Sequence, residues 1–506
     1  MKIKIKRDIE FDSDLFVNRK DEKELLGNIL NGEEKEKHFL EFTGISGQGK
    51  TELLKYFFTE TIKGKKWLAA YIDLNEPQFY RPEIYPILQE VVDDFSGKEK
   101  ISSHFNNFNE RLNSYIEELQ KYHRQLWDVP ETADRKPIDR KEEELLNGFT
   151  IILQDLLREY KIVICFDSTE RACPSIIHRL EEQILLKFID NNNFIAIFAG
   201  QQRWGWISPT LRRRVKRHQM QRLSLRDTEE FVDRLLSQNH LSAENKSDLL
   251  NKLWMLTLGH PFSSYTFLDF LSAGFRKIVT AEIINEHYNR SIQELIDKVI
   301  KNRVLEKLEL SSKYPSPEAI LSCLAPLRRI EFSTFHFILS RFLPGSFKDQ
   351  SFSFFHDLIT EFQNKIHIFT PWTLGAGFDL EEVTRNILLL DLRINHKEKF
   401  IEIQRALIEQ YDRWIEQTRD ASQIKNIVER LYHTTLLMTE ERVENITQNI
   451  AKKLKEYLNS YFTKEYIGDE YLVRDQIGRL KNVLERDKEL CLMIDVTKLL
   501  EIIESV

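Results

Sequence analysis

The chain has 506 residues, a formal net charge of −7 and 42% hydrophobic residues. This length is too great for a single hydrophobic core, so the sequence predicts several domains of ordinary size. The apolar content is sufficient for buried cores, which excludes intrinsic disorder as the main state. Charges of both signs are mixed along the chain, which excludes a protein that coats nucleic acid through its overall electrostatic field. A local basic patch is compatible with this charge distribution.

The sequence carries no obvious targeting or membrane signal. It has no apolar run of ~18 or more residues, and the N-terminal stretch MKIKIKRDIEFDSD lacks the features of a signal peptide. We therefore expect a cytoplasmic protein with no membrane partner. The four cysteines are scattered without metal-ligand spacing, which predicts reduced thiols and neither a disulfide framework nor a zinc site.

Four short apolar runs, each followed by a helical pattern, indicate parallel strands joined by crossover helices. These runs are HFLEFT (38–43), WLAAYIDL (67–74), KIVICFD (161–167) and FIAIFAG (194–200). We predict that residues 1–222 form an α/β domain, a parallel sheet with flanking helices. The polar stretch 96–144 interrupts this domain, and we predict a helical or partly mobile insertion there.

The remainder of the chain is expected to be mostly helical, because apolar residues recur at three- and four-residue spacing. Residues 223–305 are predicted to form a helical lid domain. Two β-like runs around a glycine-containing turn within 364–388 predict a winged helix over 306–395. Residues 396–506 are predicted to be a C-terminal helical domain that stacks like repeats, although no exact sequence period is found.

The stretch FTGISGQGKTELLKYF (42–57) places glycines, a lysine and a threonine between a predicted strand and a helix. It matches the pattern G-x-x-x-x-G-K-[ST] in the required context, which predicts a phosphate-binding loop and makes residues 1–222 a predicted α/β P-loop NTPase domain. Glycines let backbone N–H groups approach phosphates, the lysine adds positive charge, and the threonine offers a hydroxyl to Mg²⁺. The expected cofactors are therefore ATP or ADP and Mg²⁺, and the alternative is a plain strand-to-helix turn. The predicted binding residues are Gly44, Ser46, Gly47, Gln48, Gly49, Lys50 and Thr51.

Two carboxylates follow the predicted strand 161–167. A phosphate-binding loop requires a carboxylate at the end of a later buried strand to hold magnesium, and Asp167 stands at such a position. We assign Asp167 and Thr51 to the metal, and Glu170 to the role of general base for an attacking water. The alternatives are that Asp167 caps the next helix and that Glu170 is only a solvated side chain.

Several motifs, in this order, resemble those of STAND NTPases, which are signal-transduction ATPases related to AAA+ proteins and to NLR immune receptors. The resemblance covers about residues 11 to 435. The motifs are FVNRKDE (16–22) before the glycine-rich loop, FAGQQRW (198–204) at the sensor strand, LSLRDTEEFV (223–232) in the next helix, GHP (259–261), GFDLEEVTRNIL (377–388) at the end of the winged helix, and IVERLYH (427–433).

The resemblance implies an ATP/ADP switch. In the family, the NTPase, helical and winged-helix domains clamp ADP in a closed monomer, and a signal sensed by C-terminal repeats opens it for ATP exchange and oligomerisation. Carried over to this chain, Arg19 would lie near the adenine or ribose, and Gly259 and Pro261 would contact the base. The alternative for GHP is an ordinary turn between two helices.

Two positions depart from the family pattern. The sensor strand of the family usually ends in an arginine, but Gln201 takes that place here and Arg203 follows two residues later, so Arg203 is our candidate for the catalytic arginine. The winged-helix histidine that reads the ADP β-phosphate is replaced by Glu381, and a carboxylate would repel phosphate. Both departures predict slow or absent hydrolysis and weaken the expected ADP lock.

The segment LRRRVKRHQMQR (211–222) is strongly basic and is predicted to lie just before the last strand of the core. In AAA+ relatives an arginine finger is found there. The alternatives are a solvated basic face and a contact with nucleic acid, which we do not favour. The expected winged helix carries the acidic stretch DLEEVTRN, so we predict that it has a packing role and does not bind DNA. Trp204 and Trp206 are expected to be core or subunit contacts.

The sequence therefore predicts a nucleotide-switched signalling NTPase, acting in bacterial anti-phage defence or stress signalling. We expect an effector or sensor protein in trans, and assembly into a homo-oligomer or hetero-complex. Two alternatives remain open. One is an AAA+-type DNA-associated regulator of transposition or replication loading, and the other is a pseudo-NTPase scaffold that binds nucleotide permanently.

Overall fold

The computed structural model divides the chain into two compact units, Met1–Glu286 and His287–Val506. Within the described part of the chain, no helix is both long enough and apolar enough to span a bilayer. The residues that the structure describes are 11–33, 39–62, 67–80, 83–96, 99–128, 135–201, 203–238, 242–274, 278–279, 289–305, 314–365, 369–371, 377–417, 422–459 and 470–504.

The first unit contains a five-stranded sheet of order β2-β3-β4-β1-β5, in which every neighbouring pair is parallel. All four apolar runs predicted as strands are confirmed. Strand β1 lies between β4 and the edge strand β5, so the loop that leaves its carboxyl end lies beside the ends of these two strands. The strands are β1 (Phe39–Thr43), β2 (Trp67–Asp73), β3 (Lys161–Asp167), β4 (Phe194–Gly200) and β5 (Val215–Gln219).

The prediction that the basic segment 211–222 lies just before the last strand is wrong. The segment contains that strand, β5, and most of the preceding helix α8 (Pro209–Arg214). The sequence of β5 is VKRHQ, which contains a single apolar residue. A strand at the edge of a sheet needs only one partner and can carry charged side chains. This explains why no apolar run marks β5.

Helices cover both faces of the sheet, because buried strand residues alternate between two hydrophobic clusters. One cluster packs against α1 (Lys20–Asn31), α2 (Lys50–Tyr56) and the π-helical continuation η1 (Phe57–Thr61). The other cluster packs against helices that include α3 (Tyr85–Ser96) and α7 (Pro174–Gln183). The predicted α/β core, a parallel sheet with flanking helices, is thus confirmed. Short 3-10 turns are η2 (Pro77–Tyr80), η5 (Thr169–Arg171) and η6 (Leu185–Phe188).

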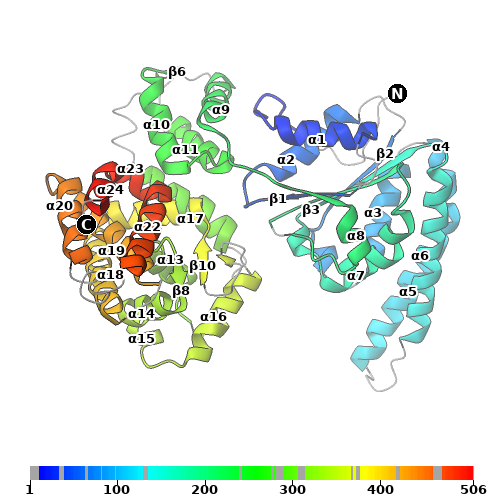
Figure 1. Ribbon diagram of the computed structural model, residues 1–506. Coiled ribbons are helices and arrows are strands. Elements are labelled where there is room, and N and C mark those ends of the chain that lie inside the picture. Colours follow the sequence, from blue (N-terminus) through cyan, green and yellow to red (C-terminus); the bar gives the residue numbers. More distant parts are fainter. Residues whose placement is uncertain are drawn as a thin grey trace. The chain divides into compact units, whose positions relative to one another are not determined.

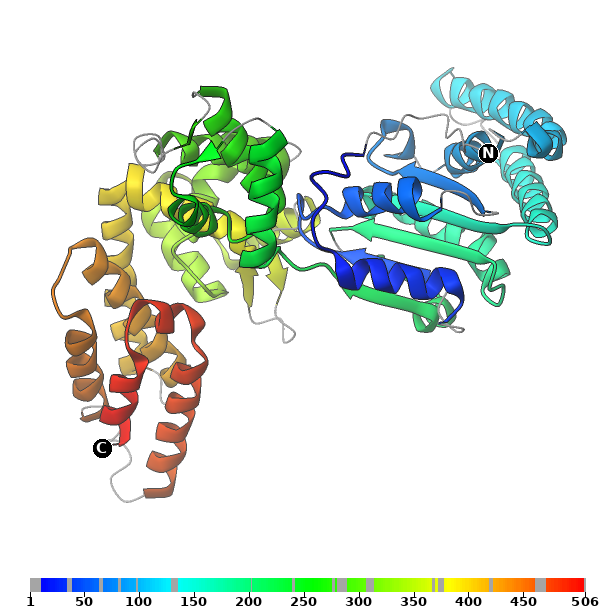
Figure 2. The same ribbon diagram turned by 90° about the horizontal axis from the view of Figure 1, so that it is seen from above.

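The polar insertion is helical, as expected. It contains α4 (Glu99–Ser102), the 3-10 turn η3 (Ser103–Phe105) and α5 (Asn106–Asp128). The long helices α5 and α6 (Lys136–Leu156) run side by side as a hairpin (Figure 1), and the view in Figure 2 agrees. Helix α6 continues beyond the predicted end of the insertion at 144, because its second half buries apolar residues such as Phe149 and Leu153 in the core.

Among the described residues that follow β5 in the first unit, the helices are α9 (Leu225–Gln238), α10 (Lys246–Thr257) and α11 (Pro261–Gly274), which fall within the range predicted for the lid. The short strands β6 (Ser242–Ala243) and β7 (Ile278–Val279) pair in parallel beside them.

The second unit is mostly helical and contains a small antiparallel sheet of order β8-β10-β9. The two predicted β-like runs correspond to β9 (Phe369–Pro371) and β10 (Gly377–Leu380), and the turn between them lies outside the described residues. The other elements up to 395 are η7 (Ile296–Leu305), α13 (Pro317–Leu324), β8 (Ile330–Glu331), α14 (Phe332–Phe342), α15 (Pro344–Phe347), α16 (Phe352–Lys365) and α17 (Glu382–Asn395). The helices after them are α18 (Lys397–Gln417), α19 (Ser422–Glu440), α20 (Ile446–Tyr457), α22 (Glu470–Arg486), α23 (Lys488–Met493) and α24 (Val496–Glu504).

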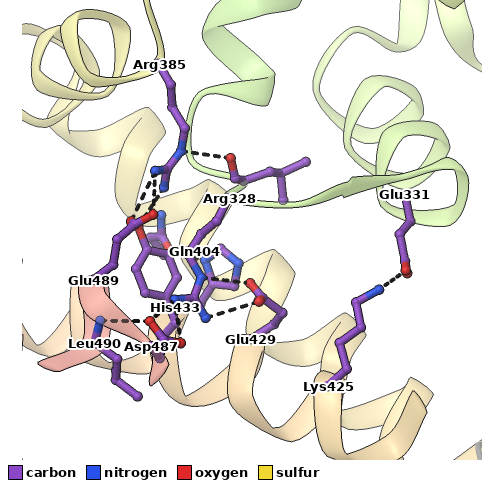
Figure 3. A network of polar contacts seen from close by, with 12 residues as sticks. Arg328, Glu331, Arg385, Gln404, Lys425, Glu429, His433, Asp487, Glu489 and Leu490 are labelled. Carbon is purple, nitrogen blue, oxygen red and sulfur yellow. Dashed lines mark hydrogen bonds and ion pairs between the residues drawn. The ribbon is translucent and has the colours of Figure 1, made fainter. Parts of the chain in front are cut away.

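A buried group of charged side chains joins the small-sheet region to the C-terminal helices within the second unit (Figure 3). Arg328 donates to both carboxylate oxygens of Asp487, at 2.6 and 2.7 Å, and to Glu429, at 3.1 and 3.2 Å. Burial alone would lower the pKa of Arg328, but Glu429 and Asp487 outweigh it and raise that pKa. Arg385 donates to Glu489 at 3.0 Å. We call these five residues the arginine network.

Candidate functional site

The glycine-rich loop connects β1 to α2 and has the left-handed backbone that its glycines predict. Gly47 has φ of 84° and Gly49 has φ of 88°, a region that side-chain-bearing residues rarely adopt. A Cβ atom at Gly47 would lie 2.6 Å from Cε1 of His260, which is closer than real contacts allow. Glycine at position 47 is therefore required both by its dihedral angles and by the approach of another segment.

Lys50, at the start of α2, is buried and turns back over the loop. Its Nζ donates to the carbonyl oxygens of Gly44 and Ile45, at 2.7 Å each. These bonds hold the ammonium group within the curve of the loop, close to the backbone that the motif assigns to phosphate binding. An anion that enters the loop would meet a cation already positioned there.

Thr51 and Asp167 meet at the carboxyl end of the sheet, although 116 positions separate them in the sequence. The Thr51 hydroxyl lies near enough to the Asp167 carboxylate to lower its pKa. Asp167 is 2% exposed, and burial raises the pKa of its carboxyl, while the hydrogen bond from Tyr71 and the nearby Thr51 hydroxyl lower it. The next helical turn, η5, has Ser168 as its N-cap and no side-chain cap, so Asp167 does not cap it.

Glu170 lies in η5, and its Oε2 accepts a hydrogen bond from the backbone N–H of Gln201 at 2.8 Å. This contact fixes the carboxylate at the end of β4, next to the strand that carries Asp167. Arg203, the predicted catalytic arginine, has an exposed side chain in the segment after β4. The structure thus anchors Glu170 at the strand ends and leaves Arg203 exposed.

Arg19 precedes α1 in a left-handed conformation, with φ of 63°, and is 6% exposed. Its guanidinium donates to the carbonyl oxygen of Gln48 in the glycine-rich loop at 2.5 Å and to that of Gln221, after β5, at 2.7 Å. Burial lowers its pKa, and Glu22 acts in the opposite direction. Arg19 therefore joins three segments of backbone around the loop.

The predicted GHP motif also lies against the loop. Pro261 is the first residue of α11, and Gly259 precedes it with φ of 75°. Between them, Nε2 of His260 lies 2.7 Å from the carbonyl oxygen of Ser46, and Nδ1 bonds the Ser263 hydroxyl at 2.7 Å. The backbone N–H of Phe262 donates to the Gly47 carbonyl at 3.3 Å. The motif is thus more than a turn between helices, because its backbone and its histidine hold the loop.

Sequence reasoning missed His260 itself, as well as Glu41 and Tyr71. Glu41 is a buried carboxylate in β1 that accepts from the backbone N–H of Trp204 and, at 3.2 Å, from the indole N–H of Trp206. It thereby holds the segment after β4, in which both tryptophans are buried in the core. An acidic residue within an apolar strand run was the one signal available for Glu41.

The arginines around β5 are engaged within the molecule. Arg212 donates to the Trp206 carbonyl at 2.7 Å, Arg214 pairs with Asp190 at 3.2 Å, and Arg217 pairs with Glu41 at 3.2 Å. These contacts hold α8 and the edge strand against the core, and they reduce the charge that the segment presents to a nucleic acid.

Glu381, the residue aligned with the family histidine, lies in the second unit. Its carboxylate accepts from the backbone N–H groups of Val383 and Thr384, at 2.8 and 2.7 Å, as the N-cap of α17. A carboxylate at this position satisfies two N–H groups that the first turn of a helix leaves unpaired. Its local role is therefore helix capping.

No protein-family model matches the sequence, and no curated protein matches it. Solved structures similar to this chain include Cdc6p from Pyrobaculum aerophilum, with 12% identity and a TM-score of 0.36, covering 78% of this chain and 99% of Cdc6p. They also include the RuvB Holliday junction branch migration motor of Thermotoga maritima, with 12% identity and a TM-score of 0.34, covering 75% of this chain and 97% of RuvB. Similarity at these TM-scores carries no argument about function.

Proposed function

We propose that this chain binds ATP or ADP with Mg²⁺ at the glycine-rich loop and acts as a nucleotide-switched ATPase of the AAA+ type. The observation that carries the proposal is the approach of two side chains, the Thr51 hydroxyl at the start of α2 and the buried Asp167 carboxylate at the end of β3, at the carboxyl end of β1 where the glycine-rich loop and Lys50 lie. It brings together the two oxygen ligands that the loop motif requires, beside the ammonium group of Lys50.

The residues present fit a nucleoside polyphosphate and its metal ion. A hydroxyl and a carboxylate are the hard oxygen ligands that Mg²⁺ prefers, and Mg²⁺ commonly takes one or two protein ligands and completes its shell with phosphate and water. Among the described residues no group of three or more His, Cys, Asp or Glu forms a metal site alone. Thr51 and Asp167 would hold the ion, which would neutralise phosphate charge, while Lys50 would exchange its bonds to the loop carbonyls for phosphate oxygens.

Hydrolysis would depend on Glu170, whose carboxylate is fixed by the backbone of Gln201. A base held at the strand ends can accept a proton from a water beside the bound phosphates. Gln201 stands where the resembling family has an arginine, so this position supplies no positive charge to stabilise the transition state. We therefore expect slow turnover.

The switch would use the contact between the loop and the lid. His260 and Phe262 bind the carbonyl groups of Ser46 and Gly47, so a change in the loop on nucleotide exchange would reach α11 directly. As in STAND proteins, which the motifs resemble, we propose that the region around β8, β9 and β10 is a winged helix. We also propose that the C-terminal helices receive a signal and that the switched state oligomerises or controls an effector in trans, in anti-phage defence or stress signalling.

The deciding experiment measures binding of fluorescent ATP and ADP analogues to the full chain, with Mg²⁺ or with EDTA. Lys50→Ala should weaken binding about 10- to 100-fold, because charge-assisted hydrogen bonds contribute ~1.5–3 kcal/mol. Lys55→Ala is the matched control, since Lys55 lies on the same helix and pairs with Glu52 instead. Equal affinity for nucleotide in the wild type and Lys50→Ala would refute the proposal.

Two further measurements separate the finer parts of the proposal. Phosphate release that disappears in Glu170→Gln would support hydrolysis, whereas tight binding without release would identify a pseudo-NTPase scaffold. Mass photometry with ATP and with ADP tests the switch, and identical mass distributions in both would count against it. Salt-sensitive binding to duplex DNA would favour the DNA-associated alternative.

A further inference from the structure

Tyr71 lies outside the glycine-rich loop and contacts the proposed metal ligand, Asp167, directly. Its hydroxyl donates to Oδ2 of Asp167 at 2.7 Å, and the backbone N–H of Ser168 donates to Oδ1 at 2.8 Å. These two hydrogen bonds fix the rotation of the carboxylate, because each engages a different oxygen.

The tyrosine is itself fixed by two other elements. It belongs to the outer strand β2, and its backbone N–H donates to the carboxylate of Asp94 on α3 at 2.9 Å. Its ring packs edge-on against Phe58 of η1, with centroids 5.7 Å apart. Since η1 continues the helix that begins at Lys50, Tyr71 connects the helix of the glycine-rich loop to the strand that carries Asp167.

The chemistry of the pair favours a donor role for the tyrosine. Tyr71 is 8% exposed, and its hydroxyl lies 2.7 Å from a carboxylate oxygen, a distance at which the phenol must be the donor. A neutral hydroxyl can only offer its hydrogen to a carboxylate, which has acceptors alone. Hydrogen-bond partners of this kind orient metal-binding carboxylates, and removing one commonly lowers metal affinity about 10- to 100-fold.

We infer that Tyr71 is a positioning residue that orients the Asp167 carboxylate for Mg²⁺ and thereby sets the magnesium requirement of nucleotide binding. The inference rests on the proposed function, since it concerns the metal at the same site. It concerns the ion and not the phosphates, because Tyr71 touches the carboxylate and none of its hydrogen bonds reaches the glycine-rich loop.

The test is a Mg²⁺ titration of fluorescent ATP-analogue binding by the full chain, compared with binding in EDTA. Tyr71→Phe removes one oxygen and keeps the ring against Phe58. We expect the half-saturating Mg²⁺ concentration to rise about tenfold or more, with affinity in EDTA unchanged. The matched control is Tyr115→Phe, because Tyr115 is also buried and also donates to a carboxylate, that of Glu142 at 3.2 Å, within the helical insertion.

The outcomes separate this inference from the proposed function. If the wild type binds no nucleotide in either condition, the proposed function fails and the inference fails with it. If the wild type binds and the Mg²⁺ curves of wild type and Tyr71→Phe coincide, only the inference is overturned. A shift that Tyr115→Phe shows equally would also overturn it, because a general loss of packing would then be the cause.

A second variant keeps the test decisive if Tyr71→Phe alone does not fold. Asp167→Asn removes the charged ligand that Tyr71 orients, so adding Tyr71→Phe to Asp167→Asn should leave the Mg²⁺ curve of Asp167→Asn unchanged. A further shift in that background would show that the hydroxyl acts elsewhere, and would overturn the inference.

Discussion

Nε2 of His260, the residue immediately before α11, lies 2.7 Å from the carbonyl oxygen of Ser46 in the glycine-rich loop. The imidazole is 2% exposed and its other nitrogen bonds Ser263, in the first turn of α11. This contact couples the position of the lid helix to the conformation of the loop, because the buried imidazole has little access to water as an alternative partner.

Replacing His260 with alanine should loosen this coupling. The Ser46 carbonyl would lose a buried partner, at a cost of about 1–3 kcal/mol, and the first turn of α11 should open more often. Hydrogen exchange by mass spectrometry should show faster exchange in peptides that cover the loop and the start of α11. His178→Ala, at an exposed position on α7, is the control and should leave exchange in these peptides unchanged. Unaltered protection in His260→Ala would contradict the coupling.

Gly47→Ala should destabilise the first unit. Its φ of 84° costs a side-chain-bearing residue about 1–2 kcal/mol, and the new methyl group would press against the His260 ring. Gly27→Ala is the opposite case, because Gly27 lies within α1 and a Cβ there meets no atom within 4 Å. That change should stabilise by about 0.5–1 kcal/mol. Urea unfolding compares the two variants, and equal stability changes would show that the loop conformation is not under this constraint.

Arg328→Met should destabilise the second unit by about 3–5 kcal/mol, because it leaves Asp487 and Glu429 buried without their cation. Arg405→Met provides the control, since Arg405 pairs with Glu441 at the surface and its loss should cost about 1 kcal/mol or less. Equilibrium urea unfolding, with hydrogen exchange to assign the transition to its unit, measures both. A small effect for Arg328→Met would mean that the network is dispensable.

The second unit should also lose stability as the pH falls below about 6.5, the ordinary pKa of histidine. His433 is fully buried, and burial, followed by the charges of Arg328 and Arg385, holds its pKa well below that value. The folded state therefore keeps His433 neutral while the unfolded state takes up a proton, which favours unfolding by up to about 1.4 kcal/mol per pH unit.

The measurement is the unfolding free energy at several pH values between 7.5 and 5, taken as the range around the ordinary histidine pKa. Substituting His433 by glutamine should flatten this dependence by about one proton. The matched change at His356, an exposed histidine of the same unit, should leave the dependence as it is. Equal slopes for wild type and His433→Gln would exclude His433 as the source.

The sequence predicted the inner strands well because each is buried on both faces and reads as an apolar run. It also predicted Lys50, Thr51 and Asp167, since a local motif and the end of a strand determine their positions. The strands β5 and β8 were harder to detect. The first is a polar edge strand, and the second contains only two residues, Ile330 and Glu331.

The contacts that complete the site could not be predicted in the same way. Tyr71 reaches Asp167 across 96 positions, and His260 reaches Ser46 across 214. No local pattern reports such pairs, because they depend on which elements the fold brings together. Glu381 is the opposite case. It aligns with a ligand position of the resembling family, but its contacts are local, because its carboxylate accepts from two backbone N–H groups at the start of α17.

The charged edge strand β5 also has a consequence for self-association. An outer strand with free hydrogen-bonding groups can recruit a strand from another molecule and so start aggregation. Here Lys216 and Arg217 stand on that strand, and a recruited strand would have to strip water from them. These charges disfavour the addition of a further strand at the β5 edge of the sheet. We therefore expect copies of the chain to assemble through other surfaces.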